Sequence, residues 1–249
     1  MSIFQEGLLT KMVNEYQLFN EIWQYYATLL LFVILSIAVS YLLGSVNSAI
    51  IVSKLLYKED IRTHGSGNAG LTNMLRTYGL GAAALTLIGD MLKTAIAIFF
   101  TAFLLGISYN NGISLNDGFC YMAGLFAVLG HVFPVFYGFK GGKGVLVTAT
   151  MALILTPIPA LILILLFAII VFFSRYVSLG SVCVAILYPI MLQGYVAFVF
   201  GGASMPGIMA LSAIILAIFI VWCHRGNLKR ISDRTERKIS IGKKKKDEE

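Results

Sequence analysis

The sequence predicts an all-α, polytopic integral membrane protein with about seven transmembrane helices, some of them short or broken. Hydrophobic residues make up 58% of the 249 residues and charged residues only 12%, whereas soluble domains carry about 25% charged residues. The mean hydropathy is +0.85, and apolar runs of roughly 20 residues recur, each long enough to cross about 30 Å of hydrocarbon. This composition excludes an ordinary soluble domain.

The apolar runs give the predicted spans in order. They cover residues 29–56, 80–105, 119–136, 145–173, 179–200 and 207–222. The fourth run is too long for one ordinary span, and Pro157 and Pro159 interrupt it. We expect the proline pair to split this run into two short segments, which brings the number of spans to seven. The alternative is a single long helix that the prolines kink.

The loops between these runs differ in charge, which predicts their side of the membrane. The loops at 58–76 and 138–144 and the C-terminal tail contain lysine and arginine, whereas the loop at 109–118 contains neither. Cytoplasmic loops carry an excess of these residues. Seven spans with the N-terminus outside and the C-terminus in the cytoplasm satisfy every loop.

Three segments follow from this pattern. Residues 1–27 form an amphipathic N-terminal extension, either an interfacial helix or a loose leader. Residues 28–223 form the transmembrane domain, and residues 224–249 form a basic cytoplasmic tail that ends in "KKKKDEE". A basic segment directly after an apolar run indicates contact with anionic lipid and not with nucleic acid.

The first polar motif is "HGSGNAGLTNMLR", residues 64–76, and it contains the string GxGxxG. A dinucleotide site would need a strand before this string and a βαβ unit around it, but the flanks here are membrane spans. The glycines still allow close approach of the backbone to an anion, and the nearby Arg62 can bind phosphate through two nitrogens. We therefore predict an anion site, with a flexible glycine-rich connector as the alternative.

The second motif is "GHVFPVFYGFKGGKG", residues 130–144, in which Lys140 and Lys143 lie among glycines. This compact cationic loop predicts a phosphate cradle, although lysines at a membrane edge also serve as topology anchors. His131 in the same motif is ambiguous, because a buried histidine bonded to a backbone carbonyl is the commoner outcome.

The third motif, "CHRGNLKRISDRTERK", follows the last span. Here His224 and Asn227 are three residues apart and share a helix face, in either a functional site or a plain juxtamembrane anchor. Ser178 interrupts the apolar sequence in "RYVSLGS".

Other kinds of catalytic site are not indicated. The sequence shows no carboxylate pair, Ser-His-Asp order, metal-ligand cluster or HxxxxD acyltransferase motif, and the three cysteines have no metal-ligand spacing. We therefore expect no metal and no cofactor. A reaction here would depend on positioning and charge stabilisation.

Together the three motifs resemble those of the bacterial acyl-phosphate-dependent glycerol-3-phosphate acyltransferases, the PlsY family, and "YLLGSVNSAIIVSKLL" and the "GD-x-x-K" at 89–93 also fit. The resemblance implies that residues 28–223 are an acyltransferase domain. Its substrates would be acyl phosphate, not acyl-CoA, and sn-glycerol 3-phosphate, which is acylated on its 1-hydroxyl. The products would be lysophosphatidic acid and inorganic phosphate, with the donor's phosphate accepting the hydroxyl proton. It further implies a bacterial plasma membrane protein with a cytoplasmic active site, and the cytosolic enzyme that makes acyl phosphate as a candidate partner.

The resemblance also assigns residues. The catalytic group would be Arg62, Lys140, Ser178 and His224. The substrate-binding group would be Ser45, Ser66, Gly67, Asn68, Thr72, Asn73, Gly141, Gly142, Lys143 and Asn227.

The chain departs from the family pattern at four positions: Ala69 stands for a usual proline, Leu71 for an alanine, Cys223 for a frequent arginine and Gly226 for an acidic residue. These departures leave an inactive paralogue as an alternative. The cationic loops also suit a channel or carrier for phosphate-containing anions, and a scaffold is a third alternative. A conducting path needs polar groups across the membrane, but Asp90 and Lys93 are few for that purpose and are spaced as a helical i,i+3 pair that supports the site.

Overall fold

The computed structural model describes residues 3–106 and 115–239, and within these ranges the chain is entirely helical outside its loops. Two single-turn 3-10 helices, η1 (Ile61–Thr63) and η2 (Val135–Tyr137), lie in loops. The α-helices are α1 (Ile3–Asn14), α2 (Ile22–Ser45), α3 (Ser48–Tyr57), α4 (Leu71–Tyr78), α5 (Leu80–Leu105), α6 (Leu115–Val132), α7 (Val145–Leu155), α8 (Pro157–Ser174), α9 (Val177–Val199), α10 (Gly207–Cys223) and α11 (Arg225–Ser232). The all-α prediction is confirmed.

The described helices include five that are long and apolar enough to cross a membrane. They comprise α2 continued by α3, and α5, α6, α8 and α9. A sixth is the pair α10 and α11, which bends by 49° at His224. Helix α7 is apolar but has only 11 residues, about 16 Å of helix. With α7 included, the helices agree with the expected number of about seven.

The fourth apolar run is split as predicted. Helix α7 ends at Leu155 and α8 begins at Pro157, where proline occupies the first turn of the helix. Proline is tolerated there because the first amides of a helix have no acceptor within it. The prolines therefore start a second helix and do not merely kink one long helix.

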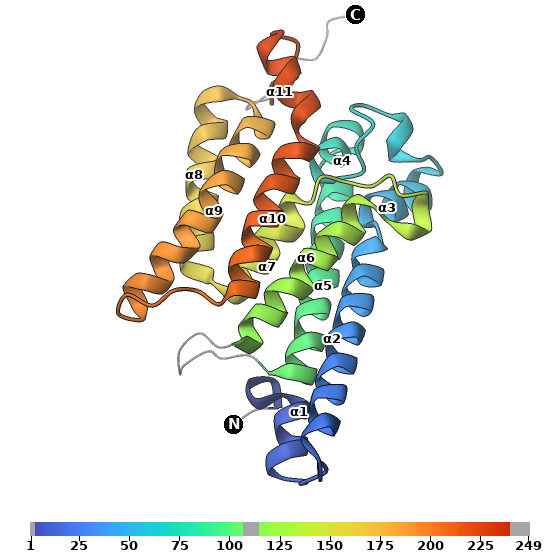
Figure 1. The fold of residues 1–249 in the computed structure, drawn as a ribbon. Helices are drawn as coiled ribbons and strands as arrows, with labels where there is room; N and C mark the ends of the chain where they lie inside the picture. The colour runs from blue at the N-terminus through green and yellow to red at the C-terminus, as the bar shows by residue number, and fades with distance from the viewer. Residues whose placement is uncertain (1–2, 107–114, 240–249) are drawn as a thin grey trace, which may run out of the picture.

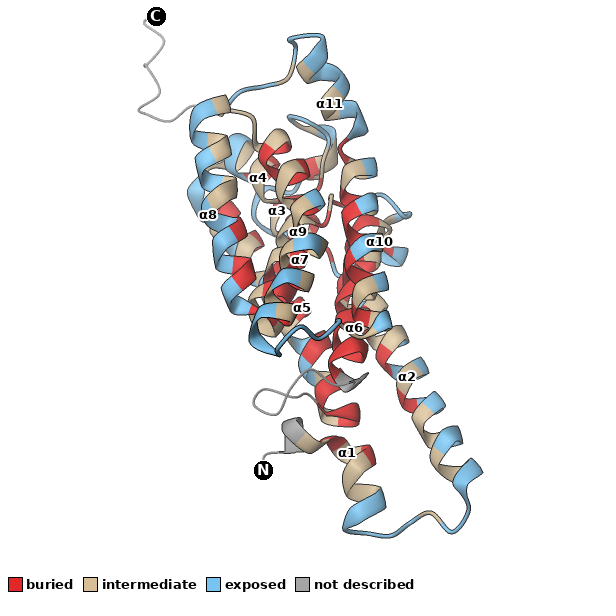
Figure 2. Ribbon diagram, turned by 60° about the vertical axis from the view of Figure 1, so that its left-hand side comes forward, coloured by how far each residue is buried: buried red, intermediate tan, exposed pale blue. Residues whose placement is uncertain are grey.

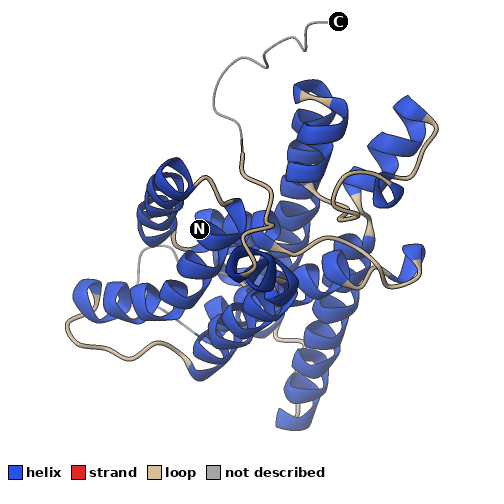
Figure 3. Cartoon of the chain, turned by 90° about the horizontal axis from the view of Figure 1, so that it is seen from above, coloured by secondary structure: helices blue, strands red, loops and turns tan. Residues whose placement is uncertain are grey.

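The chain places its unusual polar segments at one end of the bundle. Helices α3, α4 and α11 and the segment between α6 and α7 lie at the upper end in Figure 1, whereas α1 lies at the lower end. The bundle is seen along this direction in Figure 3. The predicted outer loop at 109–118 lies largely outside the described residues, as does the end of the basic tail at 240–249.

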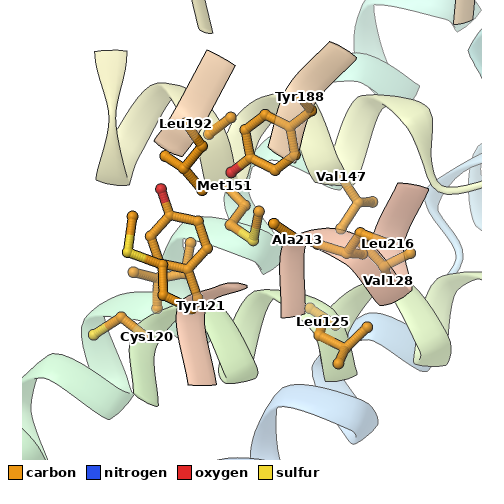
Figure 4. Packing of buried hydrophobic residues seen from close by; sticks show 14 of the residues in the cluster. Cys120, Tyr121, Leu125, Val128, Val147, Met151, Tyr188, Leu192, Ala213 and Leu216 are labelled. Atoms are coloured by element: carbon orange, nitrogen blue, oxygen red, sulfur yellow. The ribbon is translucent and has the colours of Figure 1, made fainter. Parts of the chain in front are cut away.

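The buried residues run along the sides of α5, α6 and α10 that face each other, while much of α8 and the first half of α2 is exposed (Figure 2). In Figure 4, Tyr121, Met151, Tyr188 and Leu216 pack together in this core. The exposed surfaces of α8 are aliphatic and aromatic, as expected for helices that face lipid.

Helices α2 and α6 approach closely because glycine stands on both of them. A Cβ atom on Gly44 would lie 2.2 Å from the carbonyl oxygen of Ala127, and one on Gly130 would lie 2.2 Å from that of Tyr41. Small residues at helix contacts allow such packing in membranes. The contact fixes the end of α2 against the end of α6, where the second motif begins.

Residues 3–14 of the N-terminal extension form helix α1. Helix α1 packs against the end of α5, where Gly7 meets the backbone of Leu105 and Gly106, and Leu9 is buried. Helix α1 is docked on the end of the bundle opposite α11 (Figure 1), and an interfacial place for residues 1–27 stays a prediction.

Candidate active site

A cavity of about 670 Å³ runs from the upper end of the bundle into the space between α7, α8, α9 and α10. Its polar end is formed by α4, the residues just before α7, the first turn of α9, the end of α10 and the segment after α11. Its deeper part is apolar. The polar lining includes Ser66, Asn68, Thr72, Asn73, Arg76, Asp90, His131, Lys143, Ser178, Ser181, His224, Asn227, Arg230 and Glu236.

Asn73 organises the first motif. Its side-chain amide donates to the carbonyl oxygens of Ile61 (3.2 Å), His64 (3.0 Å) and Asn68 (3.0 Å), and its Oδ1 accepts from the amide of Ser66 at 3.0 Å. Asn73 is buried, and these bonds occupy its side chain. It therefore shapes the loop that presents Ser66 and Asn68 to the cavity.

The glycines of the first motif serve this loop geometry. Gly65 and Gly67 have φ values of 60° and 71°, in the left-handed region that favours glycine. Gly67 is exposed and is not among the residues that line the cavity.

Arg62 lies outside the cavity lining. Its Nε and Nη2 donate to the carboxylate of Asp60, at 3.0 Å and 2.8 Å, and its Nη1 donates to the carbonyl oxygens of Tyr137 and Lys140. The Arg62 guanidinium holds the pKa of the Asp60 carboxyl below its usual value. In this arrangement Arg62 joins the first motif to the second, and its predicted catalytic role stays a prediction.

Arg76 is the arginine of the first motif that lines the cavity, and the sequence argument missed it. It follows Thr72 by four residues on α4, so both side chains lie on one helix face. That spacing was the available signal. Burial lowers the pKa of Arg76, but an arginine remains charged at any ordinary pH.

The two lysines of the second motif lie in different surroundings. Lys143 lines the cavity and donates to Oδ1 of Asn227 at 2.5 Å. Burial lowers its pKa, and the carboxylate of Glu236 partly opposes that effect. Lys140 is exposed and outside the lining, and its described contact is the carbonyl bond from Arg62.

The glycine amides between the lysines are already bonded. The N–H of Gly141 donates to the carbonyl oxygen of Val132 at 3.0 Å, and that of Gly142 to the carbonyl oxygen of His131 at 3.1 Å. Neither glycine lines the cavity. Both amides therefore already have acceptors within the protein and do not form a phosphate cradle in this structure. Their part in substrate binding stays a prediction.

Glu236 joins the third motif to Ser178. Its Oε1 accepts from Ser178 Oγ at 2.9 Å and Asn227 Nδ2 at 2.6 Å, and its Oε2 accepts from Arg230 Nε at 2.7 Å. Burial acts to raise the pKa of Glu236, but these hydrogen bonds outweigh it and hold the pKa below the usual value. The resemblance includes Glu236 in the third motif without a secure role, and its contact with Ser178 joins residues 58 positions apart.

His224 and Ser45 complete the predicted set. His224 is buried at the bend between α10 and α11 and lines the cavity, and its Nδ1 lies 2.8 Å from the carbonyl oxygen of Ile220. Ser45 is fully buried outside the cavity lining. Its hydroxyl donates to the carbonyl oxygen of Tyr41 and accepts from the amide of Val135, so it ties α2 to η2.

The structure therefore gathers Ser66, Asn68, Thr72, Asn73, Lys143, Ser178, His224 and Asn227 around one cavity and leaves Ser45, Arg62, Gly67, Lys140, Gly141 and Gly142 outside its lining. Among the described residues, no group of three or more His, Cys, Asp or Glu side chains is placed to hold a metal. The fold and this site define a multi-pass helical membrane protein with a cationic cavity that continues into an apolar one.

Comparison with known proteins gives the family. The model of the family described as glycerol-3-phosphate acyltransferase matches residues 34–234. The glycerol-3-phosphate acyltransferase of Endomicrobium trichonymphae is 42% identical over 214 residues, 85% of this chain and 98% of that protein. That of Paraburkholderia phytofirmans is 38% identical over 206 residues, 83% of this chain and 90% of that protein. The chain belongs to the glycerol-3-phosphate acyltransferase family.

Solved structures agree with this assignment. The crystal structure of PlsY, an integral membrane glycerol 3-phosphate acyltransferase, in its glycerol 3-phosphate form has a TM-score of 0.71 and 32% identity. The match covers 84% of this chain and 96% of that one. The lysophosphatidic acid form of PlsY gives a TM-score of 0.69 and 31% identity, over 84% and 95% of the two chains. The expected family and the multi-pass membrane fold are thus confirmed.

Proposed function

We propose that this protein transfers an acyl group from acyl phosphate to the 1-hydroxyl of sn-glycerol 3-phosphate, giving lysophosphatidic acid and inorganic phosphate for phospholipid synthesis. The observation that carries this proposal is the two-part cavity. Its polar end holds Arg76, Lys143 and His224, and the same space continues past Phe167 to Tyr188 along apolar side chains. A phosphorylated acceptor and a long acyl chain need these two environments side by side.

The cations at the polar end suit phosphate. Arg76 has a planar fork that can bind two phosphate oxygens, and Lys143 supplies a compact point charge. Both substrates carry phosphate, so the site would neutralise charge on each. Asn227 positions Lys143 through their hydrogen bond.

His224 is suited to a hydroxyl group. A carbonyl oxygen can only accept, so the contact with Ile220 requires that Nδ1 of His224 carries the proton. In the neutral ring Nε2 is then an acceptor. We infer that Nε2 accepts a hydrogen bond from a hydroxyl of glycerol 3-phosphate and orients it toward the acyl carbon.

The carboxylates that line the cavity, those of Asp90 and Glu236, already form ion pairs or hydrogen bonds with other side chains. Asp90 is paired with Lys93, and Glu236 accepts three hydrogen bonds. In the step we propose, the glycerol hydroxyl oxygen bonds to the acyl carbon and the bond from that carbon to the phosphate oxygen breaks. The departing phosphate takes the hydroxyl proton, so no protein side chain need accept it.

The sidedness of the site follows from charge. The end that carries α4 and α11 bears Arg76, Lys143 and Lys229, whereas the described charges near α1 are mostly acidic. By the positive-inside rule, this charge difference supports a site that faces the cytoplasm and an N-terminus outside. A cytoplasmic site would receive glycerol 3-phosphate directly and would be accessible to the cytosolic enzyme that makes acyl phosphate.

The test uses purified protein in lipid nanodiscs with palmitoyl phosphate and glycerol 3-phosphate. Phosphate release and lysophosphatidic acid are followed together, with palmitoyl-CoA as a parallel donor. We expect equal amounts of both products from palmitoyl phosphate and none from palmitoyl-CoA. Equal activity with palmitoyl-CoA would refute the donor assignment, and folded protein that is silent with both donors would favour the inactive paralogue.

A further inference from the structure

A polar cluster lies inside the bundle where the second motif begins, and two of its members, Asp90 and His131, also line the cavity. It consists of Asp90 and Lys93 on α5 and His131 on α6, whose side chains are at most 5% exposed. Lys93 Nζ lies 2.8 Å from Asp90 Oδ1 and 3.0 Å from His131 Nδ1. Ionisable residues within membrane helices are costly, so they are retained chiefly where they serve a function.

Lys93 also binds the break between α2 and α3. Its Nζ donates to the carbonyl oxygens of Gly44 at 3.1 Å and Val46 at 2.8 Å. These groups sit where the last carbonyls of α2 lack partners within their own helix. The ammonium group is thus held from several sides by α2, α5 and α6.

This contact holds the ring of His131 in one direction. An ammonium group has donors only, so in the tautomer that lets Lys93 donate to Nδ1 of His131, Nε2 carries the ring proton. The Nε2 edge of the ring faces Gly142, where an added Cβ atom would lie 2.0 Å from Nε2. Gly142 is therefore required to be small so that the imidazole ring can occupy this place.

The backbone of His131 holds the same loop. Its carbonyl oxygen accepts from the amide of Gly142, and the next carbonyl, that of Val132, accepts from Gly141. The residue that follows this doubly anchored pair is Lys143, whose ammonium reaches into the cavity. His131 thus contacts the loop through both its ring and its backbone, one residue before the cation.

We propose that His131, held in one orientation by Lys93 and Asp90, is a positioning residue that sets the place of Lys143 in the active site. This inference rests on the proposed function, because it assigns Lys143 to the substrate phosphate. It predicts that the ring of His131 affects catalysis only through Lys143.

The test is a double-mutant cycle of His131→Asn and Lys143→Ala in nanodiscs, with Thr101→Val as the control. Asparagine keeps an acceptor for Lys93 but removes the ring from Gly142, while Thr101 is a buried α5 residue that bonds only its own helix. We expect His131→Asn to lower kcat/KM at least tenfold, with the loss divided between kcat and the KM for glycerol 3-phosphate as it is in Lys143→Ala. In the Lys143→Ala background the same change should cost less than twofold.

Equal factors in both backgrounds would overturn the inference, because His131 would then act independently of Lys143. Calorimetric binding of glycerol 3-phosphate gives the same cycle without turnover. A wild type that binds but does not react would therefore refute the proposed function and still test this inference.

Gly142→Ala tests the same contact from the loop side, even where His131→Asn fails to fold. The added methyl group would lie 2.0 Å from the ring of His131 and 2.8 Å from the carbonyl oxygen of Ala69, and we expect it to displace the ring and raise KM for glycerol 3-phosphate at least tenfold. Gly81→Ala is the matched control, because nothing lies within 4 Å of its added Cβ atom. An unchanged KM in folded Gly142→Ala protein would contradict the proposal.

Discussion

Replacing Lys143 with alanine tests most directly which lysine of the second motif serves the site. The two lysines are three residues apart in a glycine-rich loop and look equivalent in the sequence. In the structure Lys143 lines the cavity and contacts Asn227, whereas Lys140 is exposed outside it. The two alanine variants should therefore differ.

The expected size follows from the contact that is lost. A hydrogen bond to a charged group contributes about 1.5–3 kcal/mol, which corresponds to a decrease of about 10- to 150-fold in kcat/KM. The loss should appear in kcat as well as in KM, because the charge on phosphate grows as the acyl–oxygen bond breaks. For Lys140→Ala the sequence predicts a sharp loss of turnover, but the position of its side chain leads us to expect the smaller effect.

The assay is steady-state formation of lysophosphatidic acid from palmitoyl phosphate in nanodiscs, with Lys229→Ala on the exposed face of α11 as the charge-matched control. Thermal unfolding of each variant confirms that the folded fraction is unchanged. Wild-type kinetics for Lys143→Ala, or a larger loss for Lys140→Ala, would refute the assignment of phosphate binding to Lys143.

Three further predictions concern the acyl chain, alkaline pH and acidic pH. Ala185→Phe should narrow the apolar part of the cavity and shift the substrate preference toward shorter acyl phosphates, by about fourfold in kcat/KM for each excluded methylene. Ile186→Phe, at the exposed neighbouring position, is the control. An unchanged dependence of kcat/KM on acyl-chain length in Ala185→Phe would contradict this prediction. Because burial lowers the pKa of Lys143, its ammonium loses a proton at a pH below the pKa of an ordinary lysine, and kcat/KM should fall at that pH. Lys143→Arg should abolish this alkaline decrease in a pH profile of kcat/KM, because arginine stays charged. The lowered pKa of Glu236 stabilises the fold above its unfolded-state value, and this contribution is lost as pH falls through the folded-state value. Glu236→Gln should therefore lower Tm by a few degrees at neutral pH and make Tm less sensitive to acidic pH. A Tm equal to that of the wild type at neutral and at acidic pH would show that the carboxylate does not contribute to stability.

Much of the fold was predictable because membrane helices follow rules that act along the chain. A run of apolar residues must be helical in lipid, since its backbone groups have no other partners, and Pro157 ends one helix and starts the next for local reasons. The docking of α1 was not predictable, because it depends on the contact of Gly7 with the distant backbone of Gly106.

The site was predictable where a residue's neighbours are close in sequence. Ser66 and Thr72 lie in one motif, and both line the cavity. Arg62 is close to the glycines in the sequence, but its side chain bonds to Asp60 and is not among the residues that line the cavity. Helical spacing from Thr72 would have favoured Arg76, since residues four apart share a face.

The structure shows what surrounds the two residues of the third motif that depart from the family pattern. Cys223 and Gly226 raise the possibility of an inactive paralogue in the sequence, because they flank the functional pair of the third motif. Neither lines the cavity, and an added Cβ atom on Gly226 would meet nothing closer than Arg230 Nη1 at 3.6 Å. His224 and Asn227 keep their bonds to Ile220, Lys143 and Glu236 despite both changes. The residues at these two positions therefore leave the contacts of His224 and Asn227 in place, and this favours an active enzyme over an inactive paralogue.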